Sequence, residues 1–149
     1  MGPFADVHHI CIVVADIDRA VTFYDSVGIG PWHDYPPLDQ YTDLEVPDRQ
    51  GFLGLTYKYA DVGSMQLQLV QPGDSDSPQR DFLRRKGEGV FHVGFAVEDI
   101  DRGQVEAEQL GLPVLMRGRR PDASGFTYFD TEQQAGVVLE IRQAARETA

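Results

Sequence analysis

The chain has 149 residues, of which 42% are hydrophobic and 25% charged, and a formal net charge of −11 at pH 7. Its length and composition are those of one globular domain, and its acidity argues against nucleic acid as a partner. Cys11 is the only cysteine, which excludes intramolecular disulfides and thiolate-rich zinc sites.

The sequence carries no sign of secretion or of a membrane partner. No segment approaches the run of about 18 apolar residues that a membrane-spanning helix requires. The N-terminal stretch MGPFADVHH lacks the basic and apolar regions of a secretory signal. We therefore expect a cytoplasmic protein.

The first predicted elements are a strand and a helix. The run VHHICIVV is rich in β-branched residues and predicts a strand. Asp16 follows at the N-cap position of the helix DRAVTFYDSV, and Gly28 ends that helix. Residues 52–60 and 65–71 then predict two further strands. We expect about the order βαβββ for this half of the chain, of whose four strands the pattern locates three.

The second half repeats the first. Residues 91–113 align with residues 8–30, and seven of these 23 positions are identical, including the whole of DIDR. VFHVGFAV predicts a strand, DRGQVEAEQL predicts a helix that Gly111 ends, and FTYFDT and VVLEIRQ predict closing strands. The repeat predicts an α+β fold of two tandem βαβββ modules, related by pseudo-twofold symmetry and forming a cradle.

The expected domain organisation follows from the repeat. Module 1 is expected over residues 6–72, a linker rich in Pro, Ser and Asp over residues 73–88, and module 2 over residues 89–143. Together they form one domain. The irregular segment at residues 31–51 is expected to supply the loop that faces a substrate.

Equivalent polar residues lie at the centre of the repeated strands. Alternate residues of a strand point to opposite faces, and His9 and His92 both lie opposite the bulky apolar face. Gln68 and Glu140 occupy equivalent positions in the strands that close the modules. A polar side chain in an apolar strand is costly unless it has partners.

These four residues predict a metal site. Packing of two equivalent modules about a pseudo-twofold axis brings equivalent positions together. Two imidazoles, a carboxylate and an amide oxygen suit a divalent ion such as Co, Mn, Ni, Zn or Fe(II). The predicted ligands are therefore His9, Gln68, His92 and Glu140.

The sequence resembles the vicinal-oxygen-chelate superfamily, which includes glyoxalase I, bleomycin resistance proteins and extradiol dioxygenases. Within it, the methylmalonyl-CoA epimerase family is the most similar. The resemblance runs from about residue 6 to residue 143, and its most specific stretches are VHHICIVVADIDRAVTFY, EVPDRQG, MQLQLVQP, GVFHVGFAVEDID and GVVLEI. The metal ligands of that family fall on the four residues that the repeat selects.

The resemblance implies an isomerase that abstracts the proton α to a carbonyl or thioester. In this chemistry the metal stabilises the enolate, and an acid/base group is needed on each side of the carbon. The family uses the ligand carboxylate as one base, which implies Glu140 here. Its second base is a glutamate that follows a proline and directly precedes a Gln-Gly pair.

The sequence departs from the family at this second base. VPDRQG places Asp48 after Pro47 and inserts Arg49 before the Gln-Gly pair. Asp48 is the expected second base, with Glu45 as the fallback. The alternative is that Asp48 is a turn residue of a polar loop.

Other functions of the superfamily use similar residues. A glyoxalase I-like lyase uses the same enolate chemistry, and an Fe(II) extradiol dioxygenase needs two histidines and one carboxylate, which His9, His92 and Glu140 supply. Gln68 argues against the dioxygenase because it adds a fourth protein ligand. A metal-free drug- or ligand-binding protein is the non-enzymatic alternative, and a complete ligand set argues against it.

The cations are unevenly distributed. Seven of the 13 Lys and Arg residues lie in two short stretches, RDFLRRKG (residues 80–87) and RGRR (residues 117–120). The plain interpretation is a solvated surface, whereas the functional one is binding of the phosphates of an acyl-CoA substrate. The candidate phosphate-binding residues are Arg84, Arg85, Arg119 and Arg120. The resemblance also implies a homodimer.

Overall fold

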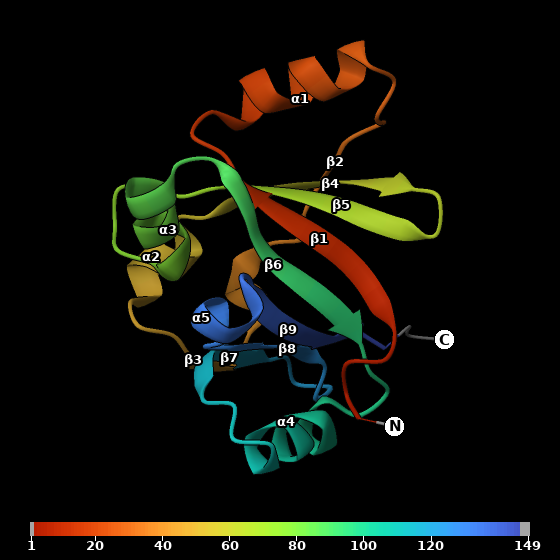
Figure 1. Cartoon of the computed structure of the whole chain (residues 1–149), viewed down its shortest axis with the longest axis vertical. Coiled ribbons are helices and arrows are strands. Elements are labelled where there is room, and N and C mark those ends of the chain that lie inside the picture. The colour runs from red at the N-terminus through yellow and green to blue at the C-terminus, as the bar shows by residue number, and fades with distance from the viewer. Residues whose placement is uncertain (1, 147–149) are drawn as a thin grey trace. The chain divides into compact units, whose positions relative to one another are not determined.

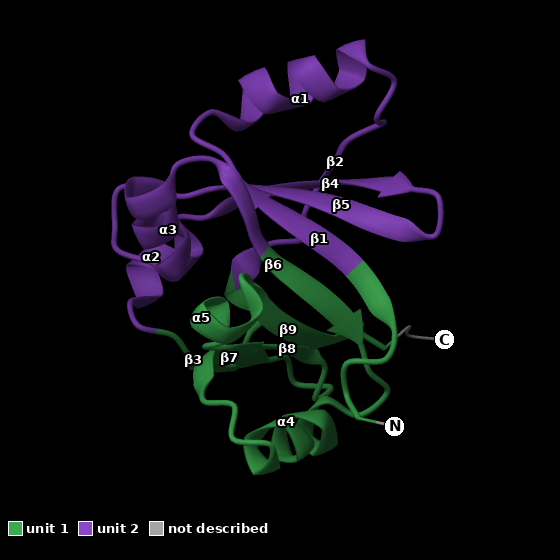
Figure 2. Ribbon diagram, viewed as in Figure 1, with its two compact units in different colours: residues 1–8, 39–46, 92–149 green, residues 9–38, 47–91 purple. Residues whose placement is uncertain are grey.

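The computed structural model describes residues 2–146 and shows a mixed α+β fold (Figure 1). The chain divides into two compact units (Figure 2). Unit 1 contains residues 1–8, 39–46 and 92–149, and unit 2 contains residues 9–38 and 47–91. Within the described residues, no helix has the length and apolar character needed to cross a bilayer.

The sheet of unit 2 has the strand order β2–β4–β5–β1. Its strands are β1 (Val7–Val13), which belongs to unit 2 from residue 9 onward, β2 (His33–Asp34), β4 (Thr56–Val62) and β5 (Met65–Gln71). Strands β1 and β5 run parallel, whereas β4 is antiparallel to both β5 and β2. Helix α1 (Ile17–Ser26) connects β1 to β2, and the short helix α2 (Arg49–Leu53) precedes β4.

The sheet of unit 1 has the strand order β6–β9–β8–β7–β3. Its strands are β3 (Asp43–Glu45), β6 (Gly89–Ala96), β7 (Val114–Arg119), β8 (Gly125–Phe129) and β9 (Val138–Gln143). Strands β6 and β9 run parallel, and the pairs β9–β8, β8–β7 and β7–β3 are antiparallel. Helix α4 (Ile100–Gln109) follows β6, and α5 (Glu132–Ala135) precedes β9.

Each unit therefore contains one βαβββ module with the same internal strand order. In both modules the first strand pairs in parallel with the last one, and the remaining strands join by antiparallel pairing. The helix and the strands that lie between the first and the last strand in the chain form the long connection that their parallel pairing requires. The predicted α+β fold with two βαβββ modules is confirmed.

The helices of the two modules begin and end as the repeat predicts. Asp16 accepts a hydrogen bond from the backbone N–H of Arg19 (3.2 Å), and Asp99 accepts one from Arg102 (3.1 Å). These caps satisfy N–H groups that have no partner within the helix. Gly28 and Gly111 follow the two helices with φ values of +86° and +90°, a conformation that favours glycine.

Both modules have an apolar core between helix and sheet. In unit 2, Val14, Ile17 and Leu69 form this core, and Ile12 packs against it. The corresponding core of unit 1 is larger, and its buried members are Ile100, Ala107, Phe129 and Ile141. The opposite strand face is buried too, because Cys11 and Val13 are both 0% exposed. Burial on both faces is typical of strands at the centre of a sheet.

Two segments that lacked a clear pattern in the sequence contain regular structure. The expected loop at residues 31–51 contains β2, a 3₁₀ turn (Leu38–Gln40), β3 and the start of α2. The expected linker at residues 73–88 contains helix α3 (Pro78–Lys86). Ser77 caps α3 by accepting a hydrogen bond from Arg80 N–H (3.0 Å), and Pro78 occupies the first turn. The Ser-Pro pair is a helix-start signal in the sequence.

Gly51 allows α2 to lie directly against the segment that precedes α3. A Cβ atom at this position would overlap the backbone carbonyl of Asp76. Because the obstacle is backbone rather than a mobile side chain, the overlap cannot be relieved by a rotamer change. The close approach fixes α2, and with it the position of Asp48 at the start of that helix.

We predict that Gly51→Ala lowers the free energy of unfolding by about 2 kcal/mol, the usual cost of overpacking a tight contact. Gly89→Ala is the matched control, because the nearest atom to its added Cβ would lie 4.0 Å away in the Phe82 ring. Urea denaturation of the two variants measures the difference. Equal stability of both variants would contradict the proposed close contact.

Candidate functional site

His92 and Glu140 form a buried pair in unit 1. They lie on the neighbouring strands β6 and β9, where His92 pairs with Val138 and Glu140 with Gly94, so their side chains share one sheet face. His92 Nε2 and Glu140 Oε2 are 3.0 Å apart. The two residues are 0% and 4% exposed. A carboxylate at this depth requires a charged or hydrogen-bonding partner, which His92 provides.

An aromatic row lies beside this pair. Tyr128 on β8 is paired with Glu140 in the sheet, and its ring centroid is 4.7 Å from that of His92. The row continues through Phe126, 5.3 Å from Tyr128, to Tyr41, 5.1 Å from Phe126. These rings present an apolar surface on the face that carries the pair, which limits the access of water to the carboxylate.

Tyr41 ends the row and holds Arg120. The guanidinium of Arg120 donates a hydrogen bond to the Tyr41 hydroxyl (3.1 Å) and lies 4.7 Å above its ring. Burial raises the pKa of Tyr41, the cation of Arg120 opposes this effect, and the charge of Glu140 adds to it. The hydroxyl therefore stays neutral at physiological pH. Arg120, a candidate phosphate ligand, also donates to Ser124 (3.2 Å).

Unit 2 carries the equivalent residues, His9 and Gln68. They lie on the parallel strands β1 and β5, where His9 pairs with Gln66 and Gln68 pairs with Cys11. His9 is 2% and Gln68 3% exposed. Gln68 Nε2 donates a hydrogen bond to Gln66 Oε1 (2.7 Å), so the amide oxygen is the atom that Gln68 can offer to a metal ion.

The two pairs have the same setting within their own sheets. Tyr59 on β4 is paired with Gln68, just as Tyr128 on β8 is paired with Glu140. Each unit thus presents one histidine, one oxygen donor and one tyrosine on a common sheet face. The four predicted ligands divide into two pairs, one in each unit. Both tyrosines lie in strands that the sequence predicts.

The donor atoms suit a divalent metal ion. His9, His92 and Glu140 offer two imidazole nitrogens and a carboxylate oxygen, and all three residues are buried. Gln68 adds an amide oxygen, and the set contains no thiolate. Mixed nitrogen and oxygen ligands are typical of sites for borderline divalent ions. The residues present therefore fit the predicted ion.

Asp48 is the N-cap residue of α2. Its side chain accepts a hydrogen bond from the backbone N–H of Gly51 (3.1 Å), and the residue is partly exposed. The alternative to a catalytic base was a turn residue of a polar loop, and the structure instead gives Asp48 the structural role of a helix cap. The cap uses one carboxylate oxygen, and the second oxygen remains a possible proton acceptor in chemical terms.

Arg84 and Arg85 lie in the last turn of α3, and both are exposed. They contact Asp81 at 3.4 Å and 2.7 Å respectively. The hydrogen bond from Arg85 lowers the pKa of Asp81, and Arg84 adds to the effect. Surface pairs of this kind contribute little to stability.

Arg119 is buried and bonded within unit 1. It is 4% exposed, and all five of its side-chain N–H groups have acceptors. Burial lowers its pKa, while the hydrogen bond to Asp101 opposes this effect. Its acceptors are the side chains of Asp101, Gln104 and Thr127 and the carbonyl groups of Gly118 and Phe126. The structure gives Arg119 the role of joining α4 to β7 and β8.

We predict that Arg119→Lys lowers the free energy of unfolding by about 3 kcal/mol, because lysine keeps the charge but leaves several buried acceptors without donors. Arg85→Lys is the control, and its effect should stay within about 0.5 kcal/mol. Chemical denaturation followed by circular dichroism compares the two. An Arg119→Lys protein as stable as the parent would contradict the structural role.

The chain belongs to the glyoxalase/bleomycin resistance protein/dioxygenase superfamily, whose family model matches residues 8–129. Bovine mitochondrial methylmalonyl-CoA epimerase is 24% identical over 92% of this chain and 73% of that protein. Methylmalonyl-CoA epimerase from Mycobacterium tuberculosis superposes with a TM-score of 0.75 at 23% identity, covering 98% of this chain and 92% of that one.

A complex of a related enzyme shows what one such protein binds. A variant of Streptomyces coelicolor methylmalonyl-CoA epimerase, in complex with 2-nitronate-propionyl-CoA, superposes with a TM-score of 0.72 at 25% identity. The similarity covers 96% of this chain and 99% of that one. These similar proteins are isomerases that act on an acyl-CoA. The resemblance to this superfamily that the sequence indicated is confirmed.

Proposed function

We propose that the chain is a metal-dependent epimerase of the methylmalonyl-CoA epimerase type, which abstracts the proton α to the thioester carbonyl of an acyl-CoA. The buried His92–Glu140 pair carries the proposal, because it places a carboxylate beside a potential metal ligand. Membership of a superfamily with structurally similar acyl-CoA epimerases supports it.

One divalent ion is proposed to bind His9 and Gln68 of unit 2 together with His92 and Glu140 of unit 1. The candidates remain Co, Mn, Ni, Zn and Fe(II), all of which accept imidazole and oxygen ligands. A bound ion supplies positive charge that stabilises the enolate oxygen of the deprotonated thioester. Three of the four ligands are uncharged, so a single carboxylate leaves a net positive charge for that purpose.

Glu140 is proposed to accept the α-proton through a carboxylate oxygen. The residue is 4% exposed, so bulk water does not compete with the substrate for its carboxylate. His92 Nε2 lies 3.0 Å from Glu140 Oε2 and orients the carboxylate, and Tyr128 packs against the His92 ring. The rigid β-sheet pairing of β6, β9 and β8 holds all three residues in place.

Asp48 is proposed to exchange a proton on the opposite side of the carbon. Epimerisation needs this second group, because a single base can only return the proton to the face from which it was removed. The N-cap hydrogen bond to Gly51 orients the Asp48 carboxylate. Arg84 and Arg85 are proposed to bind the phosphates of coenzyme A, since both are exposed cations in the last turn of α3.

We predict that Glu140→Gln slows α-proton exchange by a factor of about 100 or more, the usual contribution of a general base. The Co(II)-loaded protein is incubated with methylmalonyl-CoA in D2O, and deuterium at the α-carbon is followed by NMR. Glutamine retains an oxygen donor, so metal content measured by elemental analysis should persist. This separates loss of the base from loss of the ion.

The matched control is Glu108→Gln, an exposed residue of α4 that should exchange as the parent does. Removal of the ion with a chelator should abolish exchange, and Co(II) should restore it. If the metal-loaded parent catalyses no exchange above the buffer rate, the proposed reaction is wrong. Metal binding that survives Glu140→Ala, His92→Ala and His9→Ala together would refute the proposed ligand set.

The role of Asp48 can be separated from its capping role. We predict that Asp48→Asn keeps the stability of the parent, because asparagine is an equally good N-cap residue, whereas Asp48→Ala loses about 1 kcal/mol. Both variants should still exchange the α-proton of the epimer that Glu140 deprotonates. Both should lose conversion of one epimer into the other, measured by chiral analysis of the acyl group.

If Asp48→Asn interconverts the epimers at the parental rate, Asp48 serves only as a cap. Glu45, the fallback indicated by the sequence, is then tested by Glu45→Gln in the same assay. It lies on β3 and is exposed.

A further inference from the structure

Arg142 shares a sheet face of unit 1 with Glu140. It follows Glu140 by two residues on β9, so both side chains leave the strand on the same side. Arg142 is partly buried and pairs across the sheet with Phe126, a member of the aromatic row. On β6, the residues that pair with Glu140 and Arg142 are Gly94 and Ala96. Because these side chains are no larger than a methyl group, β6 places nothing bulky beside either residue.

No carboxylate pairs with Arg142 in the part of the chain that the structure describes. Arg142 Nη1 donates a hydrogen bond to His8 Nε2 (2.9 Å). A guanidinium can only donate, so this nitrogen of His8 accepts and carries no proton. Within the described residues, His8 is the only hydrogen-bond partner of the Arg142 side chain. A partly buried cation is seldom left without an anionic partner, because burial weakens its hydration.

The repeat shows that a module does not need a cation at this position. Residues 65–71 align with residues 137–143, which matches Arg142 with Val70. Val70 is 0% exposed and lies on the same strand face as Gln68, the counterpart of Glu140. A compact apolar side chain therefore fills this position in unit 2. The charge of Arg142 belongs to unit 1 alone, and packing does not explain it.

A second guanidinium lies at the end of the aromatic row. Arg120 donates hydrogen bonds to the hydroxyl groups of Tyr41 and Ser124, and its buried Nε has no partner. Burial raises the pKa of Tyr41, and the charges of Arg120, Glu140 and Arg142 also act on it. These three charged groups therefore lie around one residue. Together they carry a net positive charge, which favours an anionic ligand.

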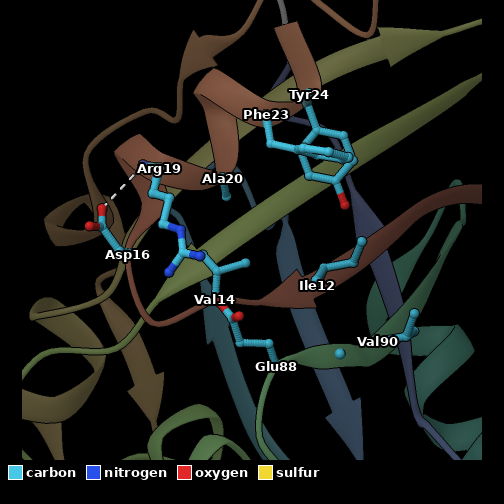
Figure 3. Close-up of a pocket in the computed structure, with 10 residues that line it drawn as sticks. Ile12, Val14, Asp16, Arg19, Ala20, Phe23, Tyr24, Glu88 and Val90 are labelled. Atoms are coloured by element: carbon cyan, nitrogen blue, oxygen red, sulfur yellow. Dashed lines mark hydrogen bonds between the residues drawn. The ribbon is translucent and has the colours of Figure 1, made fainter. Parts of the chain in front are cut away.

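An open groove of unit 2 has the opposite balance of charge. It lies between α1 and the sheet and has a volume of about 460 Å3 (Figure 3). The residues that line it include Arg19, but also the carboxylates of Asp16 and Glu88. The groove also lies on the face of β1 that carries Ile12, opposite to His9. An anionic ligand is therefore expected at the face of Glu140 rather than in this groove.

We propose that Arg142 binds a carboxylate carried by the acyl group of the substrate, and so selects an anionic acyl-CoA over a neutral one. The inference rests on the proposed function, which brings the acyl group to Glu140. Nη1 of Arg142 is bonded to His8, which leaves Nε and Nη2 for the two parallel hydrogen bonds that a guanidinium makes to a carboxylate. His8 thereby orients the guanidinium, and Arg120 adds a second positive charge.

Isothermal titration calorimetry of the Co(II)-loaded protein with malonyl-CoA and with acetyl-CoA tests the proposal. Both thioesters carry the same coenzyme A, so contacts to its phosphates cancel when the two dissociation constants are compared. The parent should bind malonyl-CoA more tightly. Arg142→Gln should raise the dissociation constant of malonyl-CoA by about tenfold or more and change that of acetyl-CoA by less than about twofold, because only malonyl-CoA loses a charged hydrogen-bond partner. Arg142→Val, which introduces the residue found at the equivalent position of unit 2, should have the same effect.

Arg102→Gln is the matched control, because it removes the same charge from an exposed position of α4. This variant should bind both thioesters as the parent does, and circular dichroism should show that all three variants are folded. If Arg142→Gln weakens the binding of malonyl-CoA and acetyl-CoA by the same factor, Arg142 does not recognise the acyl carboxylate and the inference is overturned.

α-Proton exchange decides the proposed function separately. A parent that exchanges the α-proton of methylmalonyl-CoA, combined with an Arg142→Gln protein that keeps the parental preference for malonyl-CoA, retains the proposed reaction and rules out this role of Arg142. If the parent binds neither thioester, the proposed acyl-CoA substrate and the role of Arg142 are both wrong.

Discussion

Parallel pairing of the first and last strands of each module is the constraint on which the site depends. It places His92 and Glu140, which are far apart in the sequence, on adjacent strands and on one face. The same pairing places His9 beside the strand of Gln68. Two parallel strands cannot be joined by a hairpin. The helix of each module and the antiparallel strands that follow it form the long connection between the first and the last strand. A shift of one residue in either pairing would turn one donor of the pair to the opposite face.

The sequence was sufficient to predict the modules because the repeat provides two independent views of one pattern. Asp16 and Asp99 cap their helices, and Gly28 and Gly111 follow them in the left-handed conformation. Strand alternation likewise identified the buried polar residues without reference to the structure. These features depend on local chemistry and on residue spacing, and both can be read from the amino-acid sequence.

Other features depend on contacts that the sequence does not encode locally. Arg119 looked like part of a basic surface patch, but residues of α4 and β8 accept four of its five side-chain hydrogen bonds, and Gly118 of its own strand accepts the fifth. Nothing in RGRR distinguishes Arg119 from Arg117, because the partners are residues of α4 and β8. Strand β3 was missed for a similar reason: a short polar segment becomes a strand only through pairing with β7. The proposed catalytic role of Asp48 depends on the position of a substrate, whereas its capping role follows from the chain alone.

The differences between the modules are as informative as their similarity. If Gln68 were a glutamate like its counterpart Glu140, the proposed shell would hold two buried carboxylates. One of them would then tend to take up a proton, and the positive charge left for an enolate would be smaller. One amide and one carboxylate avoid both effects while preserving an oxygen donor in each module. The modules also differ on the helix side of their sheets, where Phe4 packs against the core of unit 1 and the position equivalent to it in the repeat is Gly87. Duplication supplied a symmetric framework, and divergence at a few positions, above all Gln68 against Glu140, makes the two proposed halves of the metal site chemically different.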